Sequence, residues 1–143
     1  MEELIANQIK NTGKFPHLVS LGRPWNGILL LLSYLFGGLI ITNTINLPLI
    51  LGGLSFLALY MAGTTLNDIF DFEEDKINMP YRPLQKEIIS INEAYIFSII
   101  LYLIGILISY SLGSLILLIA TIFIVLSFLY SVEPAKFVKR GIL

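Results

Sequence analysis

LPLILGGLSFLALYMAGTTL, residues 47–66, is a run of twenty residues without a charge, and the acidic stretch NDIFDFEED follows it directly. At a rise of about 1.5 Å per residue, a helix of this length spans about 30 Å, the thickness of a bilayer's hydrocarbon core. A helix is the natural choice, because unpaired backbone groups are costly in lipid and the run lacks the alternation of a barrel strand. We therefore expect residues 47–66 to cross a membrane.

The rest of the chain has the same character. It is 56% hydrophobic and 13% charged over 143 residues, whereas about 25% of the residues in a soluble domain are charged. A second apolar run covers 25–41, and an uncharged stretch covers 94–130, which the small, polar SYSLGS at 109–114 divides in two. The sequence predicts an all-α integral membrane domain over 25–143, with four transmembrane helices at about 25–41, 47–66, 94–109 and 113–130 and a loop at 67–93.

The basic residues indicate an orientation. All nine Lys and Arg residues lie before the first span, in the 67–93 loop or after the fourth span. By the positive-inside rule we expect a multi-pass protein of the cell membrane with both termini and the 67–93 loop in the cytoplasm. Residues 1–24 lack the pattern of a cleaved signal peptide, and we expect them to form an amphipathic segment lying in the membrane interface.

Composition limits the possible chemistry. The net charge of −1 gives no basic surplus, so no nucleic-acid partner is expected. The chain has no cysteine and one histidine, His17. Any metal would therefore be held by oxygen ligands, which points to Mg²⁺, Ca²⁺ or Mn²⁺.

Seven of the ten acidic residues lie between Asp68 and Glu93. They could simply form a solvated loop. If the second helix continues through them, however, four side chains share an arc of about 100°, while Glu73 and Glu74 are expected to point elsewhere. The four are Asn67, Asp68, Asp71 and Asp75. An amide oxygen with two or three carboxylates suits Mg²⁺ bound together with a diphosphate, and such a cation would reverse the repulsion between acids one turn apart.

A proline-flanked arginine follows the acids. Pro80 and Pro83 restrict the backbone on either side of Arg82 to a rigid, extended turn. Such a turn could direct the guanidinium back toward a diphosphate, where its fork geometry is favoured. The alternative is that Arg82 only contributes to topology.

Three segments carry a family resemblance. The order N-D-x-x-D-x-x-x-D-x-x-N-x-P-x-R-P-L at 67–84 resembles the first aspartate-rich motif of the UbiA prenyltransferase superfamily. R-P-W-N at 23–26 is similar to that family's entry into its first helix. YSVEPAKFVKRG at 130–141 resembles its Tyr…Lys segment, in a variant like that of chlorophyll synthases.

The resemblance implies a function. UbiA-type enzymes transfer a prenyl group from an allylic isoprenyl diphosphate to an aromatic or other lipophilic acceptor within the membrane, with Mg²⁺. It implies that Asn67, Asp71 and Asp75, with or without Asp68, hold Mg²⁺. Diphosphate oxygens would contact Arg82 together with Lys136 or Lys139, and Tyr130 would lie near the breaking C–O bond.

The resemblance covers only the family's N-terminal half. No second D-x-x-x-D follows the first cluster in this sequence. We therefore expect an incomplete or split enzyme, or a chain that pairs with a second copy or with a C-terminal-half subunit. The rival hypothesis is a non-catalytic remnant or regulatory membrane subunit that keeps the first motif. A cation transporter is disfavoured, because the acids lie at the end of a span and not at its middle.

Overall fold

The structure, a computed structural model, describes residues 13–131. All regular elements in this range are helices: α2 (Phe15–Leu21), α3 (Pro24–Thr42), α4 (Leu47–Phe70), α5 (Phe72–Asn78), α6 (Ile91–Leu112) and α7 (Ser114–Ser131). Of these, α3, α4, α6 and α7 are long and apolar enough to cross a membrane. The predicted all-α fold with four membrane helices is confirmed.

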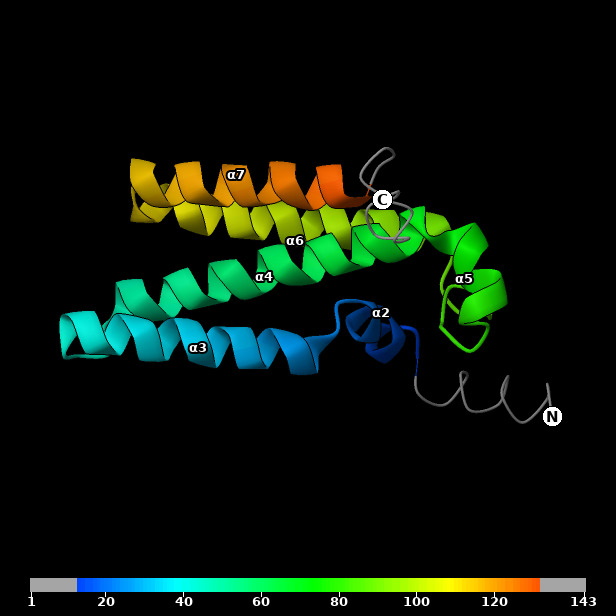
Figure 1. Ribbon diagram of the computed structural model, residues 1–143, viewed down its shortest axis with the longest axis horizontal. Helices are drawn as coiled ribbons and strands as arrows, with labels where there is room; N and C mark the ends of the chain where they lie inside the picture. The colour runs from blue at the N-terminus through cyan, green and yellow to red at the C-terminus, as the bar shows by residue number, and fades with distance from the viewer. Residues whose placement is uncertain (1–12, 132–143) are drawn as a thin grey trace, which may run out of the picture.

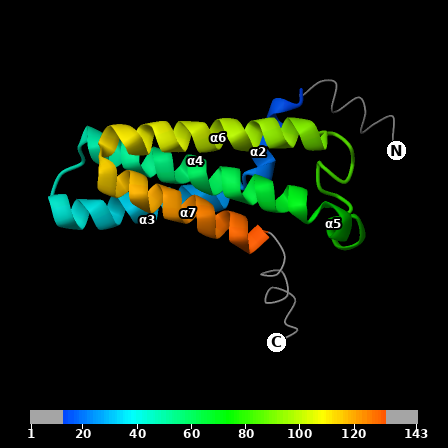
Figure 2. The same ribbon diagram turned by 90° about the horizontal axis from the view of Figure 1, so that it is seen from above.

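Helix α4 is the centre of the bundle. It crosses diagonally between α3 on one side and α6 with α7 on the other, and it packs against all three (Figure 1). Seen from above, α6 and α7 run antiparallel, and α4 is visible between them (Figure 2). Helices α2 and α5 lie at one end of the bundle, and the short connections after α3 and α6 lie at the other. The long polar loop is thus confined to one end, while the side of the membrane that this end faces stays a prediction.

Hydroxyl groups and glycine hold α4 and α6 together. Ser55 Oγ donates to the carbonyl of Gly105 at 2.8 Å and lies 2.8 Å from Ser109 Oγ, and Ser98 Oγ donates to the carbonyl of Ala62 at 3.0 Å. Lipid tails are as apolar as leucine, so close packing and interhelical hydrogen bonds drive such association. Small residues at this interface therefore set the position of α4.

Gly105→Ala should test this packing. A Cβ at Gly105 would lie 2.5 Å from Leu59 Cδ2 and 3.3 Å from the carbonyl oxygen of Ser55, so the Leu59 side chain must move or α4 and α6 must separate slightly. We expect a loss of about 1–3 kcal/mol, measured as a lower melting temperature in detergent. Gly37→Ala is the matched control, because a Cβ there would meet nothing within 4 Å. Equal melting temperatures for the two variants would contradict tight α4–α6 packing.

A small apolar core fastens the 79–90 connection to the helix ends. It consists of Leu21, Ile69, Leu84, Ile89 and Ala94. Leu84 and Ile89 are 2% and 1% exposed. The start of α6 is closed by a capping box, in which the side chains of Ser90 and Glu93 each accept from the other's backbone N–H. The turn that carries Arg82 is therefore anchored only two residues away.

The helix does not run uninterrupted through the acidic residues. Helix α4 ends at Phe70, four residues beyond the predicted span, and α5 starts at Phe72. The residue between them, Asp71, has φ −87° and ψ 7°, the bridge region of turns. Backbone bonds from Asp71 to Asn67 (2.9 Å) and from Asp75 to Asp71 (2.8 Å) nevertheless continue across the break. Helix α5 bends away here and Phe72 packs on the apolar core.

Candidate functional site

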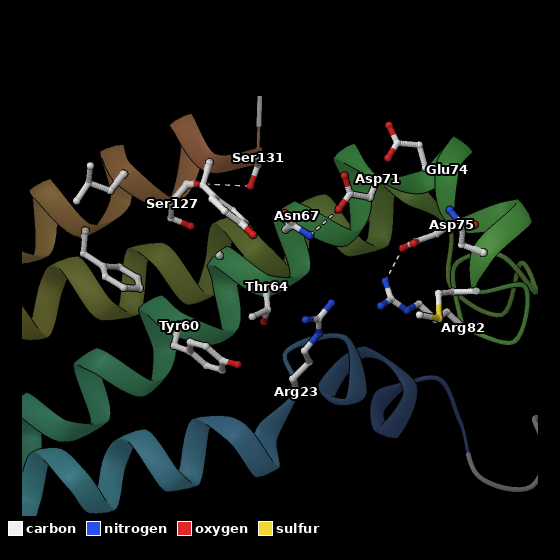
Figure 3. Close-up of a pocket in the computed structure, with 16 residues that line it drawn as sticks. Arg23, Tyr60, Thr64, Asn67, Asp71, Glu74, Asp75, Arg82, Ser127 and Ser131 are labelled. Carbon is white, nitrogen blue, oxygen red and sulfur yellow. Dashed lines mark hydrogen bonds and ion pairs between the residues drawn. The ribbon is translucent and has the colours of Figure 1, made fainter. Parts of the chain in front are cut away.

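A cavity of about 800 Å³ lies at the end of the bundle where α4 meets α5. Its lining comes from α4, α5, α7, the start of α3 and the turn after α5, namely Arg23, Tyr60, Gly63, Thr64, Asn67, Asp71, Glu74, Asp75, Asn78, Met79, Arg82, Phe123, Leu126, Ser127, Tyr130 and Ser131. Polar groups gather toward α5 (Figure 3), whereas Tyr60, Phe123 and Leu126 are about one to two turns further into the bundle along α4 and α7. The cavity therefore has a charged end and an apolar, aromatic end.

One face of α4 and α5 presents carboxylate and amide groups to the cavity, whose oxygen atoms are of the kind that bind metal ions. It is formed by Asn67, Asp71, Glu74, Asp75 and Asn78. Asn67 Nδ2 donates to Asp71 Oδ2 at 2.8 Å, which fixes both side chains. The expectation that Glu74 points elsewhere is wrong. At about 100° per residue it falls only about 20° from Asn67, so the helical spacing itself places it on this face.

Asp68 lies apart from that face. It is 4% exposed and does not line the cavity. Its Oδ1 accepts a hydrogen bond from Arg23 Nη2 at 2.6 Å and from Arg82 Nη1 at 3.1 Å. The structure thus brings three of the four predicted metal ligands to the cavity and places the fourth against two arginines.

Arg82 bridges the break between α4 and α5. Its Nη1 donates both to Asp68 Oδ1, at 3.1 Å, and to Asp75 Oδ2. The side chain points back from the turn toward the acids and lines the cavity. Because Asp68 and Asp75 lie on different helices, Arg82 links the end of α4 to α5.

Arg23 is a cavity residue that was not among the predicted site residues. It is the N-cap of α3, with φ 49° and ψ 59°. This left-handed conformation costs about 1–2 kcal/mol for a residue with a Cβ. Figure 3 shows its side chain extending from α3 toward α4. The R-P-W-N sequence at 23–26 was the signal that could have identified it.

The last two turns of α7 form the opposite wall. Tyr130 lines the cavity there with Ser127 and Ser131. The helix approaches α4 closely, since a Cβ at Gly63 would lie 2.4 Å from Ser127 Oγ. Lys136 and Lys139 lie outside the described residues, so their predicted contacts with a diphosphate stay predictions.

The donor set fits Mg²⁺. Within residues 13–131, no three His, Cys, Asp or Glu side chains gather as a preformed metal cluster. Mg²⁺ is usually held by one or two carboxylates, waters and substrate phosphates. The carboxylate and amide oxygens of the cavity therefore suit Mg²⁺ that arrives with a diphosphate. Asn67, Asp71 and Asp75 would hold it, with Glu74 beside them.

Comparison with known proteins agrees with the sequence motifs. The model of the UbiA prenyltransferase family matches residues 26–142. The chain is 38% identical over 128 residues to the digeranylgeranylglyceryl phosphate synthase of Korarchaeum cryptofilum, covering 90% of this chain and 44% of that protein. The synthase of the same name from Pyrococcus horikoshii is 35% identical over 125 residues, which cover 84% of this chain and 45% of the relative.

A third relative has the same name as the first two. The digeranylgeranylglyceryl phosphate synthase of Methanosphaera stadtmanae is 31% identical over 118 residues, covering 81% of this chain and 43% of the relative. The chain thus spans less than half the length of each of these three relatives. No solved structure matches it.

Proposed function

The chain belongs to the UbiA prenyltransferase family, and from that membership we propose that its cavity binds an isoprenyl diphosphate with Mg²⁺ for prenyl transfer in the membrane. The observation that carries the proposal is the arrangement of groups around one cavity. Two guanidinium groups and a face of oxygen donors lie at its charged end, and aromatic and aliphatic side chains form the other end. A diphosphate with a hydrocarbon tail has the same division of polarity.

The charged end would bind the leaving group. Arg23 and Arg82 present N–H donors suited to phosphate oxygens. When bound, Mg²⁺ would neutralise charge on the diphosphate. The allylic C–O bond breaks, and its electron pair leaves with the diphosphate. The acceptor oxygen then bonds to the allylic carbon, and its proton passes to water or to the released diphosphate. The two arginines stabilise the charge that develops on the leaving oxygen.

Side chains of α7 would protect the allylic cation. Tyr130 lies on the last turn of α7 and lines the cavity. An aromatic face stabilises a nearby cation by about 0.5–2 kcal/mol. Phe123 and Leu126, about one to two turns earlier on α7, form an apolar wall for the hydrocarbon chain and limit the access of water. We also keep Lys136 or Lys139 as a further ligand of the diphosphate.

The relatives refine the substrates. Their shared name describes a glyceryl phosphate that carries two geranylgeranyl groups. Adding the second such group requires geranylgeranyl diphosphate as donor and a singly geranylgeranylated glyceryl phosphate as acceptor. We propose these two substrates for this chain, in place of an aromatic acceptor.

We propose that further helices, which are not part of this chain's described residues, complete the cavity wall. The three relatives are more than twice as long as the segment they share with this chain. The apolar faces of α3 and α7 expose large side chains such as Leu29, Phe36 and Leu118, which suits lipid or further helices. A second copy or a C-terminal-half subunit would then supply the remaining wall.

Membranes that hold only this polypeptide provide the test. With geranylgeranyl diphosphate, the proposed acceptor and Mg²⁺, we expect release of diphosphate and formation of the doubly geranylgeranylated product. EDTA should stop both, and membranes without the chain should show neither. Mg²⁺-dependent binding of the donor without any product, from a correctly folded chain, would exclude completion by a second copy and would leave a required C-terminal-half subunit or the non-catalytic alternative.

A further inference from the structure

Asp68 contacts both arginines of the cavity without lining the cavity itself. Arg23 comes from the start of α3, 45 residues earlier, and Arg82 from the turn 14 residues later. The same oxygen, Oδ1, accepts from both guanidinium groups. Three segments far apart in the sequence therefore meet at one buried carboxylate.

We propose that Asp68 is a positioning residue, which holds Arg23 and Arg82 in the orientation that binds a diphosphate, and that it is not a metal ligand. This inference rests on the proposed diphosphate site. Asn67, Asp71 and Asp75 line the cavity, while Asp68 is directed at the arginines. Asp68 lies on the last turn of α4, before the break at Asp71, whereas Asp75 lies on α5 and lines the cavity.

The geometry leaves the arginines able to bind an anion. A guanidinium has five N–H donors in a planar fork. Arg23 donates a hydrogen bond from Nη2 to Asp68, and Arg82 donates from Nη1 to Asp68 and Asp75. Other N–H groups of each remain for phosphate oxygens, and both side chains line the cavity. Their side chains are 39% and 24% exposed. Asp68 restricts both of them, and Asp75 restricts Arg82 as well.

Two effects of Asp68 on diphosphate affinity oppose each other. Its negative charge repels the diphosphate, whereas its hydrogen bonds restrict two long side chains before the ligand arrives. The charge lies behind two guanidinium groups, which compensate it. The gain from holding the two arginines in place before the ligand binds therefore outweighs the repulsion between Asp68 and the diphosphate. Loss of Asp68 should weaken diphosphate binding although it removes a like charge.

Asp68→Asn tests this directly. The probe is inorganic pyrophosphate, titrated by calorimetry into the full chain in detergent, once with Mg²⁺ and once with EDTA. We expect affinity to fall about tenfold in both conditions, the scale of one charge-assisted hydrogen bond, with the half-saturating Mg²⁺ concentration unchanged. The same substitution in an Arg23→Ala, Arg82→Ala background should cause no further loss.

Glu73→Gln is the matched control. Glu73 pairs with Lys76 at 3.0 Å on the exposed side of α5 and does not line the cavity, so pyrophosphate affinity should not change. If Asp68→Asn does not fold, Asp68→Glu keeps the charge but displaces the carboxylate by one methylene, and it should also weaken binding in EDTA.

The outcomes separate the possible roles of Asp68. A loss that appears only with Mg²⁺, or that persists without the arginines, would identify a metal ligand and overturn the inference. Unchanged or stronger binding would also overturn it. Failure of the wild-type chain to bind pyrophosphate under any condition would remove the proposed function and this inference together, whereas normal binding by Asp68→Asn would remove only the inference.

Discussion

Replacement of Asp71 by alanine is expected to abolish the Mg²⁺-dependent part of diphosphate binding, a loss of at least about a hundredfold. Even groups that only orient metal ligands change metal affinity by about 10- to 100-fold when removed, and a ligand should cost no less. Asp71 lies at the junction of α4 and α5, where its Oδ2 accepts from Asn67 Nδ2. The substitution therefore removes one carboxylate and releases the neighbouring amide.

The fold should survive this change. The backbone N–H of Asp71 donates to the carbonyl of Asn67 at 2.9 Å whatever the side chain, and φ −87° is open to any residue. Pyrophosphate titration with and without Mg²⁺ measures the effect. Affinity in EDTA should match the wild type, and the gain on adding Mg²⁺ should disappear. Glu73→Ala, which removes a carboxylate on the exposed side of α5, should keep that gain. If Asp71→Ala also keeps the gain in pyrophosphate affinity on adding Mg²⁺, Asp71 is not a metal ligand.

The membrane helices were predictable because the bilayer imposes a simple rule of length and polarity. The end of α4 was not. The apolar run ends at residue 66, but the helix continues to Phe70. Its last turn carries Asp68, which is buried because Arg23 and Arg82 reach it from elsewhere in the fold. Window-based hydropathy contains no information about such distant partners.

The site was partly predictable, because helical spacing can be read from the sequence whereas tertiary contacts cannot. Helical spacing correctly put Asn67, Asp71 and Asp75 on one face, and it would also have found Glu74 had the arc been extended by about 20°. Spacing alone could not separate Asp68 from them. That distinction depends on the bend at Asp71 and on the position of Arg23, which is 45 residues away in the sequence. Local periodicity gives the face of a helix, and tertiary contacts decide which residues on it are used.

Arg82→Ala is expected to weaken pyrophosphate binding by about 10- to 100-fold, both in EDTA and with Mg²⁺, because hydrogen bonds to charged groups contribute about 1.5–3 kcal/mol. The substitution also leaves Asp75, its ion-pair partner on α5, with its negative charge facing the ligand. Mg²⁺ should still strengthen binding, since the oxygen donors of α4 and α5 remain. Calorimetric titration under the two conditions separates this result from that of Asp71→Ala.

Two further variants decide how Arg82 acts. Arg82→Lys keeps the charge but loses the planar fork, so its affinity should lie between those of the wild type and Arg82→Ala. Lys86→Ala removes a cation from the exposed part of the same connection, outside the cavity lining, and should leave affinity unchanged. If all three variants bind pyrophosphate as the wild type does, Arg82 has only a topological or structural role. If Arg82→Ala and Lys86→Ala are equally weakened, the loop acts through its total charge, and the orientation of Arg82 toward Asp68 and Asp75 has no part in binding.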